Sequence, residues 1–484
     1  MTKKVRCSVI MNVLIISVNQ CHSPMPVMPL GACRVAEAAE QAGHKVTFLD
    51  LMFHKEPVQS VLAALRQCRP DVIGLSIRNI DNNDMRNPVF FLQEVRQLVD
   101  SIRTVTEATI ILGGSALAVM PEAILTFVKA DLAVVGNGET VFPKLLERIQ
   151  VGRSLNDVEG IVYCENGAVR KNSRSAGCSD EYTHPDLHHW IDSAAYLMHA
   201  ATVPVQTKQG CPFKCVYCTY HMIEGNTYQL ARPDRVADTV VRLVEQGKRD
   251  IEFVDSVFNA PYDHAMALCE SLARVRHGAR LQSLELNPVH FDDALVIAME
   301  RAGFVGMGIT VESASDPVLR GLRKGFTSRE VYGAAEVVRR HRLPCAWIFL
   351  LGGPGETRET VQETLRFAGR SVRKQDVAFF NVGIRIYPGT ELESIARRQG
   401  VLTCPPEDML TPVFYSSPEV DADWMIAEIK KTRDAHVNFI TSDSLNRSYL
   451  PMIQRAGSFL GLRPPLWRHT RYIRRGLKLV GLDG

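Results

Sequence analysis

The stretch VPVQTKQGCPFKCVYC, residues 203–218, carries the strongest signal in the sequence. Its first five residues form a short apolar run that predicts a buried β-strand. The run leads into a loop that holds Cys211, Cys215 and Cys218 with the spacing C-x3-C-x2-C. Three thiolates on one tight loop can hold three corners of a cubane iron–sulfur cluster and leave the fourth iron without a protein thiolate.

Two alternatives to the cluster stay open at this point. Zinc requires a fourth ligand, and His221 lies three residues after Cys218. The three thiols can also pack as ordinary side chains, although Lys214 and the neighbouring Gly, Pro and Tyr residues are typical of an exposed loop. The ligand spacing favours the cluster over both alternatives.

The loop lies near the start of a regular series of strands and helices. Strands are predicted at residues 203–207, 250–254, 281–286, 306–311, 345–351 and 377–386. Helices are predicted at residues 233–246, 265–276, 292–302, 328–342 and 359–368. This alternation predicts a partial (β/α)6 barrel of the TIM type, in which chemistry takes place at the carboxyl ends of the strands.

An earlier series of the same kind precedes the barrel. Strands are predicted at residues 12–17, 45–49, 71–77, 109–112 and 131–135, with helices at 31–42, 58–67, 89–103 and 139–149. The alternation predicts a Rossmann-like, doubly wound parallel sheet. We therefore expect an α/β chain with four parts: a first domain over 1–150, a linker over 151–200 with a hairpin near 165–167, the barrel over 201–395 and a helical region over 396–484. Residues 1–10 are expected to be an extension before the first strand.

Composition limits the class of protein. The 484 residues are 46% hydrophobic and 23% charged, which excludes collagen-like, coiled-coil and wholly disordered chains. Lys and Arg number 56 against 53 Asp and Glu, so the net charge of +3 gives no reason to expect nucleic acid as a partner. Neither a secretory signal nor an apolar run long enough for a membrane span is found. The nine cysteines outside the loop are scattered, which favours a reduced, cytoplasmic location.

The cysteine loop resembles the signature of the radical S-adenosylmethionine enzymes. In that family C-x3-C-x2-C follows the first barrel strand, and an aromatic residue, here Tyr217, precedes the last cysteine. The resemblance implies that the cysteines hold a 4Fe–4S cluster whose open iron chelates S-adenosylmethionine, and that electron transfer cleaves it to a 5'-deoxyadenosyl radical. It further implies three contacts with S-adenosylmethionine. EFVDS (252–256) would contact the methionine amino group, GITVES (308–313) would contact the ribose or the carboxylate, and LLGGPGET (350–357) would contact the adenine. The residues so assigned are Glu252, Asp255, Ser256, Glu312, Ser313, Gly352 and Gly353.

The first domain resembles the cobalamin-binding domain of cobalamin-dependent radical enzymes. The matching stretches are PLGACRVAEAAEQAGHKVTFLD (29–50), GLSIRNIDNND (74–84), LGGSALAVMPE (112–122) and VVGNGETVFPKLL (134–146). The D-x-H-x-x-G motif that offers a histidine to cobalt is absent, because His54 follows Asp50 at the wrong spacing. The resemblance therefore implies cobalamin without a histidine ligand and with Arg78 near the lower face of the corrin. The cofactor-binding residues implied here are Arg78, Asn79, Gly113, Gly114, Gly136, Gly138 and Glu139.

The expected activity is methyl transfer from S-adenosylmethionine, via methylcobalamin, to an unactivated carbon of a small molecule of the natural-product, lipid or tetrapyrrole type. A cyclase or rearrangement enzyme with the same cofactors, or a non-radical methyl transfer, is the alternative. A methylthiotransferase is disfavoured because Cys21, Cys33 and Cys68 are widely spaced. A cobalamin or redox sensor is disfavoured because each strand motif is present. An external one-electron reductant of the flavodoxin or ferredoxin type is the expected protein partner.

Other segments have less specific interpretations. Arg385 or Tyr387, in IRIYPGTEL, is expected at the barrel mouth in contact with cofactor or substrate, or else in a plain strand-terminating turn. The loop after the cluster contains His221, Glu224 and Tyr228, which either line the cavity or cover the cluster. The basic segment 463–478 is either a packed helix or a weak membrane-surface contact.

Overall fold

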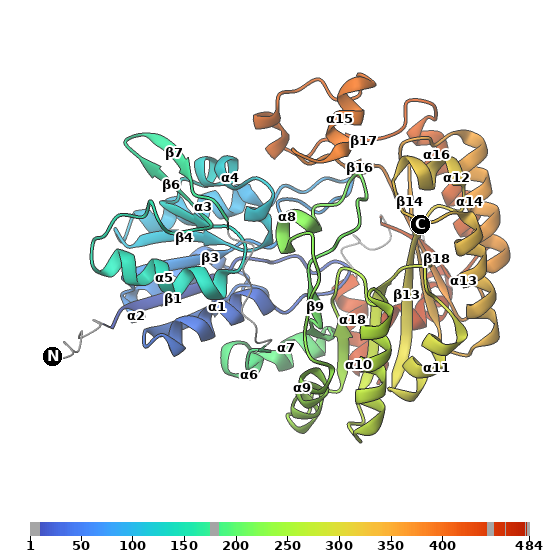
Figure 1. The fold of residues 1–484 in the computed structure, drawn as a ribbon, viewed down its shortest axis with the longest axis horizontal. Helices are drawn as coiled ribbons and strands as arrows, with labels where there is room; N and C mark the ends of the chain where they lie inside the picture. Colours follow the sequence, from blue (N-terminus) through green and yellow to red (C-terminus); the bar gives the residue numbers. More distant parts are fainter. Residues whose placement is uncertain (1–9, 175–182, 443–449, 460, 480, 482–484) are drawn as a thin grey trace. The chain divides into compact units, whose positions relative to one another are not determined.

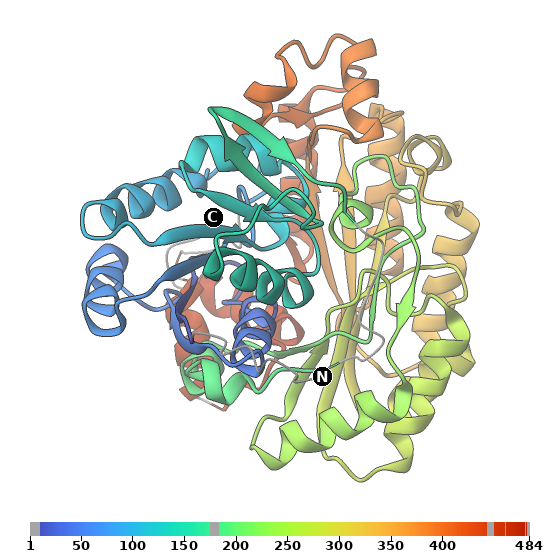
Figure 2. The same cartoon turned by 60° about the vertical axis from the view of Figure 1, so that its left-hand side comes forward.

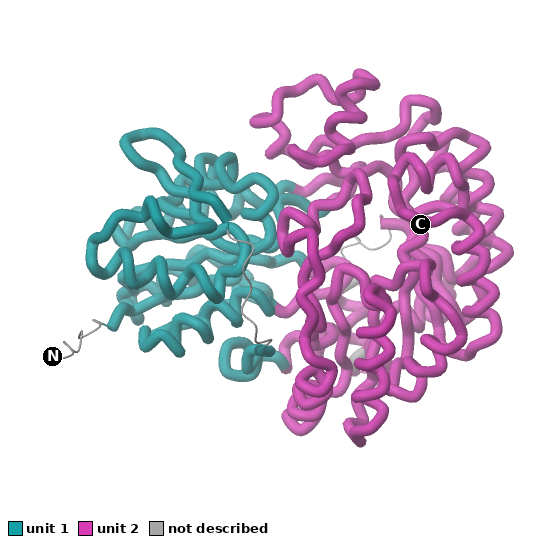
Figure 3. The backbone as a smooth tube through the Cα atoms, viewed as in Figure 1, with its two compact units in different colours: residues 1–21, 29–82, 90–193 teal, residues 22–28, 83–89, 194–484 magenta. Residues whose placement is uncertain are grey.

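The computed structural model describes residues 10–174, 183–442, 450–459, 461–479 and 481, so most of the expected extension at residues 1–10 lies outside it. The chain forms two compact units, which are shown in two colours in Figure 3. Unit 1 contains the described residues up to 21, together with 29–82 and 90–193. Unit 2 contains the described residues from 194 onward, together with the short segments 22–28 and 83–89. The Nε2 amide of Gln454 anchors the first of these segments by donating a hydrogen bond to the Pro24 carbonyl oxygen, at 2.6 Å.

Unit 1 is built on a seven-stranded sheet in the order β2-β1-β3-β4-β5-β6-β7. The parallel strands, labelled in Figure 1, are β1 (Asn12–Ser17), β2 (Lys45–Asp50), β3 (Val72–Ser76), β4 (Thr109–Gly113) and β5 (Leu132–Val134). Helices α1 (Leu30–Gln41) and α5 (Gly138–Gln150) pack together, and α3 (Leu92–Arg103) packs against α2 (Pro57–Cys68) and α4 (Pro121–Val128). The predicted doubly wound sheet is confirmed. Its chain order reverses between β1 and β3, where such sheets bind their ligands.

The hairpin predicted near residues 165–167 is present, but it belongs to the sheet. Strands β6 (Ile161–Glu165) and β7 (Ala168–Lys171) pair antiparallel, and β6 continues the sheet beyond β5. Asn166 and Gly167 both have positive φ, at 51° and 78°, as a two-residue hairpin turn requires. The interpretation of 151–200 as a linker therefore does not describe the structure, because buried Ile161 and Val162 cover the edge of β5. Helix α6 (Leu187–Trp190) follows in the same unit.

Unit 2 contains the predicted partial β/α barrel. Its seven strands are all parallel and lie in the order β18-β15-β14-β13-β12-β11-β8. They are β8 (Val203–Val205), β11 (Asp250–Phe253), β12 (Arg280–Leu286), β13 (Phe304–Glu312), β14 (Cys345–Leu351), β15 (Val377–Val382) and β18 (Phe439–Thr441). The edge strands β8 and β18 do not pair with each other among the described residues, so the barrel is open.

Helices cover the outer face of the barrel sheet. They are α9 (Pro233–Glu245), α10 (Tyr262–Arg274), α11 (Asp293–Arg301), α12 (Asp316–Gly321), α13 (Ser328–Arg340) and α14 (Arg358–Ser371). Figure 2 shows them, in green to orange, along one side of the strands. None of the helices in the described part of the chain combines the length and the apolar character that a membrane crossing needs.

The region after residue 395 is less helical than predicted. Besides α15 (Glu391–Arg398), α16 (Ala422–Ala435), α18 (Leu450–Phe459) and α19 (Thr470–Leu479), it contains two 3-10 turns, η2 (Pro406–Leu410) and η3 (Leu466–His469). It also supplies β17 (Phe414–Tyr415), which pairs with β16 (Ile384–Arg385), and the edge strand β18 of the barrel. Three-residue strands are too short to show a periodicity in the sequence.

Residues from η3 close the lower end of the barrel, where its strands begin. A Cβ placed on Gly306 of β13 would lie only 2.7 Å from the Trp467 ring, so the indole occupies the space that a side chain would need. The indole N–H of Trp467 also donates a hydrogen bond of 3.2 Å to the side-chain oxygen of Gln282. The barrel interior is therefore reached from the other end, where the strands finish.

Candidate active site

The cysteine loop lies between two short strands and a short helix at the carboxyl end of β8. The strands β9 (Lys208–Gln209) and β10 (Gln229–Leu230) pair antiparallel, and α8 (Tyr220–Glu224) connects the loop to β10. Gly210 has φ +86°, and a Cβ there would lie 2.0 Å from the Thr227 carbonyl oxygen. The Cys211 N–H donates to the Gly225 carbonyl oxygen at 3.0 Å. The loop is therefore held against the chain that follows α8.

The three thiols differ little in their surroundings. Cys211 is buried, and Cys215 and Cys218 are half-buried. Burial raises the pKa of each thiol, to about 12 for Cys218. No three His, Cys, Asp or Glu side chains in the described ranges are grouped closely enough to bind a single metal ion. Thiols spread along one loop suit a cluster, in which each cysteine binds a different iron, whereas His221 is exposed and completes no zinc site with them.

A buried ion pair lies beside the loop. Lys324 follows α12, and its Nζ lies 3.2 Å from Oε1 of Glu312, the last residue of β13. The hydroxyl of Tyr217 donates to the same carboxylate oxygen at 2.6 Å and lies 3.3 Å from Nζ. Glu312 has φ +63°, a left-handed conformation that a non-glycine residue rarely adopts and that is enriched at functional sites. The structure therefore brings the predicted residues Tyr217 and Glu312 together and adds Lys324, which the sequence analysis missed.

A second acid that the sequence analysis missed lies in the upper barrel. The pairing of β12 with β13 shifts register between Ser283 and Leu286. Such a bulge turns neighbouring side chains toward one face. Burial and, next to it, the charge of Glu312 raise the pKa of Glu285 to about 7, although the charge of Lys324 acts in the opposite direction. Because a bulge is a property of strand pairing, no single stretch of sequence shows it.

Of the three residues predicted from EFVDS, only Ser256 touches the cysteine loop. Its hydroxyl donates to the Gly210 carbonyl oxygen at 3.0 Å. Asp255 is fully buried, and its carboxylate accepts hydrogen bonds from the Thr207 N–H at 2.6 Å and the Thr207 hydroxyl at 2.5 Å. It thereby fixes the chain as it leaves β8.

Glu252 lies lower in the barrel than its predicted role requires. Its carboxylate accepts hydrogen bonds from the Thr202 hydroxyl at 2.6 Å and from the Gln282 amide at 2.8 Å. Gln282 is also the residue that Trp467 contacts at the lower end of the barrel. The structure therefore does not bring Glu252 to the thiols.

The residues predicted after β13 and β14 have contacts within the barrel wall. The Ser313 hydroxyl lies 2.9 Å from the Thr364 hydroxyl of α14 and faces away from the interior. Gly352 has φ +91°, as its turn requires. A Cβ on Gly353 would lie 2.9 Å from the Leu322 side chain, and Leu322 accepts a backbone hydrogen bond from Val216 of the cysteine loop. Gly353 therefore supports the loop by letting Leu322 pack close.

Arg385 does not project into the barrel mouth. It is buried, and its guanidinium donates to the carbonyl oxygens of Ile386 at 2.6 Å and Met409 at 2.8 Å. It also lies over the Tyr387 ring, 4.7 Å from its centre. These contacts bind the β16 turn to η2, so the strand-terminating alternative describes Arg385 better than the predicted contact with cofactor or substrate.

In the loop after the cluster, Glu224 has a clear structural role. The carboxylate of Glu224 accepts hydrogen bonds from the Gly210 N–H at 3.1 Å and from the Gln206 amide at 2.8 Å. It thus covers the base of the cysteine loop. The Tyr228 hydroxyl is buried without a hydrogen-bond partner among the described residues, and burial raises its pKa.

The predicted glycines of unit 1 lie where β4 and β5 end. Gly114 has φ +99°, and a Cβ there would lie 2.3 Å from the Ile77 carbonyl oxygen. Gly136 has φ +102°, and Gly138 begins α5. Glu139 lies in the first turn of α5. Gly113, by contrast, has nothing within 4 Å of a Cβ position, so open space lies beside it at the carboxyl edge of the sheet. This edge therefore has room for a ligand.

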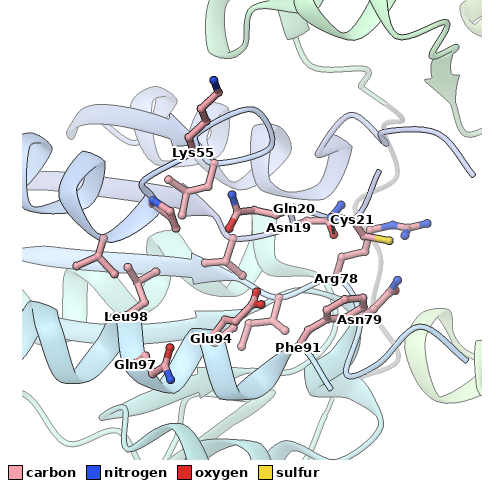
Figure 4. A pocket seen from close by; sticks show the side chains of 16 residues that line it. Asn19, Gln20, Cys21, Lys55, Arg78, Asn79, Phe91, Glu94, Gln97 and Leu98 are labelled. Carbon is pink, nitrogen blue, oxygen red and sulfur yellow. Dashed lines mark hydrogen bonds between the residues drawn. The ribbon is translucent and has the colours of Figure 1, made fainter. Parts of the chain in front are cut away.

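A hollow of about 470 Å³ lies at the same edge, at the switch point between β1 and β3 (Figure 4). Arg78 and Asn79 line it together with Asn19, Lys55 and Glu94. The Nδ2 amide of Asn19 is buried there and has no hydrogen-bond partner in the part of the chain that the structure describes. A buried donor that lacks a partner suits a ligand rich in acceptors, such as the amide side chains of a corrin. The residues present therefore fit cobalamin.

Comparisons with known proteins agree with this division of the chain. The model of the radical SAM superfamily matches residues 205–368, and that of the B12 binding domain matches residues 16–146. An uncharacterised methyltransferase of Pyrococcus horikoshii is 26% identical over 383 residues, which are 77% of this chain and 79% of the relative. Tryptophan 2-C-methyltransferase of Streptomyces laurentii is 24% identical over 440 residues, covering 78% of this chain and 73% of the relative.

A solved structure matches over nearly the whole length. The radical S-adenosylmethionine methyltransferase TsrM from Kitasatospora setae, with cobalamin and a 4Fe–4S cluster bound, superposes with a TM-score of 0.83 at 22% identity, covering 98% of this chain and all of that one. The radical SAM and B12 binding domains give the cofactors of the chain as a 4Fe–4S cluster, S-adenosylmethionine and cobalamin. The chain is therefore an enzyme that joins a B12 binding domain to a domain of the radical SAM superfamily, and it is similar over most of its length to cobalamin-dependent radical S-adenosylmethionine methyltransferases.

Proposed function

We propose that this enzyme transfers a methyl group from S-adenosylmethionine to a carbon atom of a small organic molecule. The observation that carries the proposal is the combination, in one chain, of the cysteine loop at the carboxyl end of the barrel strands and a B12-binding sheet. When bound, the cluster supplies electrons or Lewis acidity, and cobalamin supplies a carrier for the methyl group. The protein's own task is to place these groups and to exclude water.

Named residues divide that task. Cys211, Cys215 and Cys218 hold the cluster on a loop that Gly210 and Glu224 fix from below. Arg78 and Asn79 line the hollow that we assign to part of cobalamin. The three carboxyls Glu252, Glu285 and Glu312 make the barrel interior acidic, with Lys324 as counter-charge. A polar interior of this kind suits a substrate with hydrogen-bond donors.

The substrate class that we propose is a natural product or its precursor, such as an amino acid or a lipid. Support comes from the relatives: one acts on tryptophan, and a second, from Methylococcus capsulatus, is named hopanoid C-3 methylase and is 24% identical over 402 residues. The carboxyl end of the barrel, where the cysteine loop lies, is the place at which such a molecule would meet the methyl donor.

The experiment begins with anaerobic reconstitution using iron, sulfide and cobalamin, for which we expect about four irons and one cobalamin per chain. Methyl-deuterated S-adenosylmethionine and a panel of amino acids and lipids are then added, starting with tryptophan. A product heavier by one labelled methyl group, together with an equal amount of S-adenosylhomocysteine, supports the proposal. Cys215→Ala should abolish turnover and keep cobalamin binding. A product that loses hydrogen or water without gaining the label would instead indicate a cyclase or rearrangement.

Two further partners are proposed with this activity. An external one-electron reductant of the flavodoxin or ferredoxin type would keep the cofactors reduced, which is consistent with a cytoplasmic location and with the scattered free cysteines. Weak contact with an anionic membrane surface is proposed for the basic segment 463–478, because it contains six Arg and Lys and no Asp or Glu. Tyr472 and Leu479 of α19 are exposed there.

A further inference from the structure

The buried ammonium of Lys324 lies beside the cysteine loop. Lys324 is only 7% exposed. Its Nζ lies 3.2 Å from Glu312 Oε1 and 3.3 Å from the hydroxyl of Tyr217, which stands between Cys215 and Cys218 in the chain. It also lies 5.8 Å from the centres of the Tyr217 and Phe326 rings. The ammonium is thus enclosed between one carboxylate and two aromatic side chains, one of which belongs to the cysteine loop.

The surroundings keep this lysine charged. Burial alone would lower the pKa of Lys324, but the charges of Glu312, Cys215 and Cys218 outweigh burial and raise it above the ordinary value. The cysteine loop and the segment before Lys324 also meet through the backbone, because the Val216 N–H donates a hydrogen bond of 3.2 Å to the Leu322 carbonyl oxygen. The positive charge is therefore held against the loop.

The backbone holds Lys324 in this place with residues of unusual conformation. Arg323 has φ +52° and Gly325 has φ +75°, so Lys324 stands between two left-handed positions. Its partner Glu312 is left-handed as well. Non-glycine residues in this region cost free energy and persist where the surrounding structure fixes them. The surrounding backbone therefore fixes the ion pair in place at the barrel mouth.

A fixed positive charge close to an iron–sulfur cluster acts on its redox equilibrium. The reduced cluster carries one more negative charge than the oxidised cluster, and a nearby cation stabilises the more negative state. Net charge, hydrogen bonds to the sulfurs and solvent exposure are the properties that set cluster potentials. Lys324 contributes to the first and the third, since it is charged and shielded from water.

We propose that Lys324 tunes the reduction potential of the 4Fe–4S cluster, raising it by holding a shielded positive charge against the cysteine loop, at the hydroxyl of Tyr217. Glu312 moderates the effect, because it offsets part of the ammonium charge and fixes its position. Lys324 is thus a tuning residue that acts through its charge. The inference rests on the cluster that we propose for the three cysteines and is independent of the substrate.

The experiment compares the midpoint potentials of reconstituted variants without S-adenosylmethionine, followed by electron paramagnetic resonance during an anaerobic redox titration. Lys324→Met should make the potential more negative, so that at a fixed potential the oxidised-to-reduced ratio rises tenfold or more, about 59 mV for one electron. Lys324→Arg, which keeps the charge, should remain near the wild type. Glu312→Gln should shift the potential in the positive direction, because it removes the opposing charge.

Lys214 offers a matched control on the same loop. It is adjacent to Cys215 in the chain but exposed, so solvent screens its charge, and Lys214→Met should leave the potential unchanged. Equal shifts in Lys214→Met and Lys324→Met would refute the inference, as would an unchanged potential in Lys324→Met. If Lys324→Met does not retain its iron, the double variant Lys324→Met/Glu312→Gln replaces it, because this variant leaves no buried charge without its partner. Its reduction potential should still be more negative than that of Glu312→Gln alone.

A titration of S-adenosylmethionine binding completes the comparison. Weaker binding in Lys324→Met with an unchanged potential would overturn the tuning role and would show that the ammonium binds S-adenosylmethionine instead. Because neither measurement uses a methyl acceptor, failure of the proposed methyl transfer would leave the result for Lys324 intact.

Discussion

The buried carboxyl of Glu356 should make the stability of the barrel depend on pH. It is fully buried in the turn after β14, where Oε1 accepts a hydrogen bond from the Thr360 hydroxyl at 2.6 Å and Oε2 accepts one from the Gly352 N–H at 3.1 Å. Burial raises its pKa from 4.5 to about 7, the two hydrogen bonds act to lower it, and the charge of Glu363 adds to the rise.

The sign of the effect follows from the direction of this shift. Below pH 4.5 the carboxyl is protonated in both the folded and unfolded chain, and the stability is at its full value. Between pH 4.5 and about 7 the unfolded chain ionises first, so the free energy of unfolding falls as the pH rises. A rise of the pKa from 4.5 to about 7 corresponds to a free energy of unfolding of about 3 kcal/mol, which is lost once the pH exceeds the folded pKa. That loss lowers the unfolding temperature by roughly 5–8 °C.

Glu356→Gln should remove this loss. The Gln side chain keeps the bond from Gly352, and its amide can donate to the Thr360 hydroxyl, whose proton can then turn to the Thr357 carbonyl oxygen, 3.0 Å away. We expect the variant to unfold at nearly the wild-type temperature at pH 5 and at a clearly higher temperature at pH 8. Circular dichroism melts of the reconstituted protein, kept free of oxygen, measure both values.

A neighbouring carboxyl provides the control. Glu359 is exposed, and its hydrogen bonds to its own backbone and to Thr357 lower its pKa, so Glu359→Gln should bring no gain in stability at pH 8. Equal stabilisation by Glu356→Gln at pH 5 and pH 8 would refute the reasoning, because the effect would then have no connection with ionisation. An unfolding temperature of Glu356→Gln equal to that of the wild type at pH 8 would refute it as well.

Three further substitutions test other parts of the structure. Arg385→Leu should lower the free energy of unfolding by about 3 kcal/mol or more, and with it the unfolding temperature, because it leaves buried carbonyl oxygens unpaired. The affinity for S-adenosylmethionine, measured by equilibrium binding, should stay the same. Gly114→Ala should reduce cobalamin uptake, measured by absorbance, because its Cβ would lie 2.3 Å from the Ile77 carbonyl oxygen; wild-type uptake would contradict this. Trp467→Ala should cost about 3–5 kcal/mol through the cavity left above Gly306, and a melt unchanged from wild type would show that the ring does not support the barrel.

The two sheets and the cysteine loop were predictable because each depends on local patterns. Apolar runs with helical stretches between them fixed both series of strands, and the spacing of Cys211, Cys215 and Cys218 is a property of a few adjacent residues. The paired strands β6 and β7 were partly predictable from Asn166–Gly167. Their membership of the first sheet was not, because that depends on which edge β6 meets.

The sequence could not show in which direction each predicted side chain points. Asp255 and Ser256 are adjacent in a stretch that resembles a family motif, but their side chains have different partners, and only Ser256 meets the cysteine loop. Lys324 was missed for a related reason. It lies 107 residues after Tyr217, in a loop, and only the barrel brings the two together.

The hydrogen bond between Gln454 and Pro24 joins residues 430 positions apart within one compact unit. A ribosome that adds 5–20 residues per second needs roughly 20–90 s to make that length of chain. The sheet of unit 1 can form early in this interval, but residues 22–28 and 83–89 must wait for partners that are synthesised much later. During synthesis these two segments are exposed to chaperones and proteases, and the barrel forms its last contacts only after the chain has nearly left the ribosome.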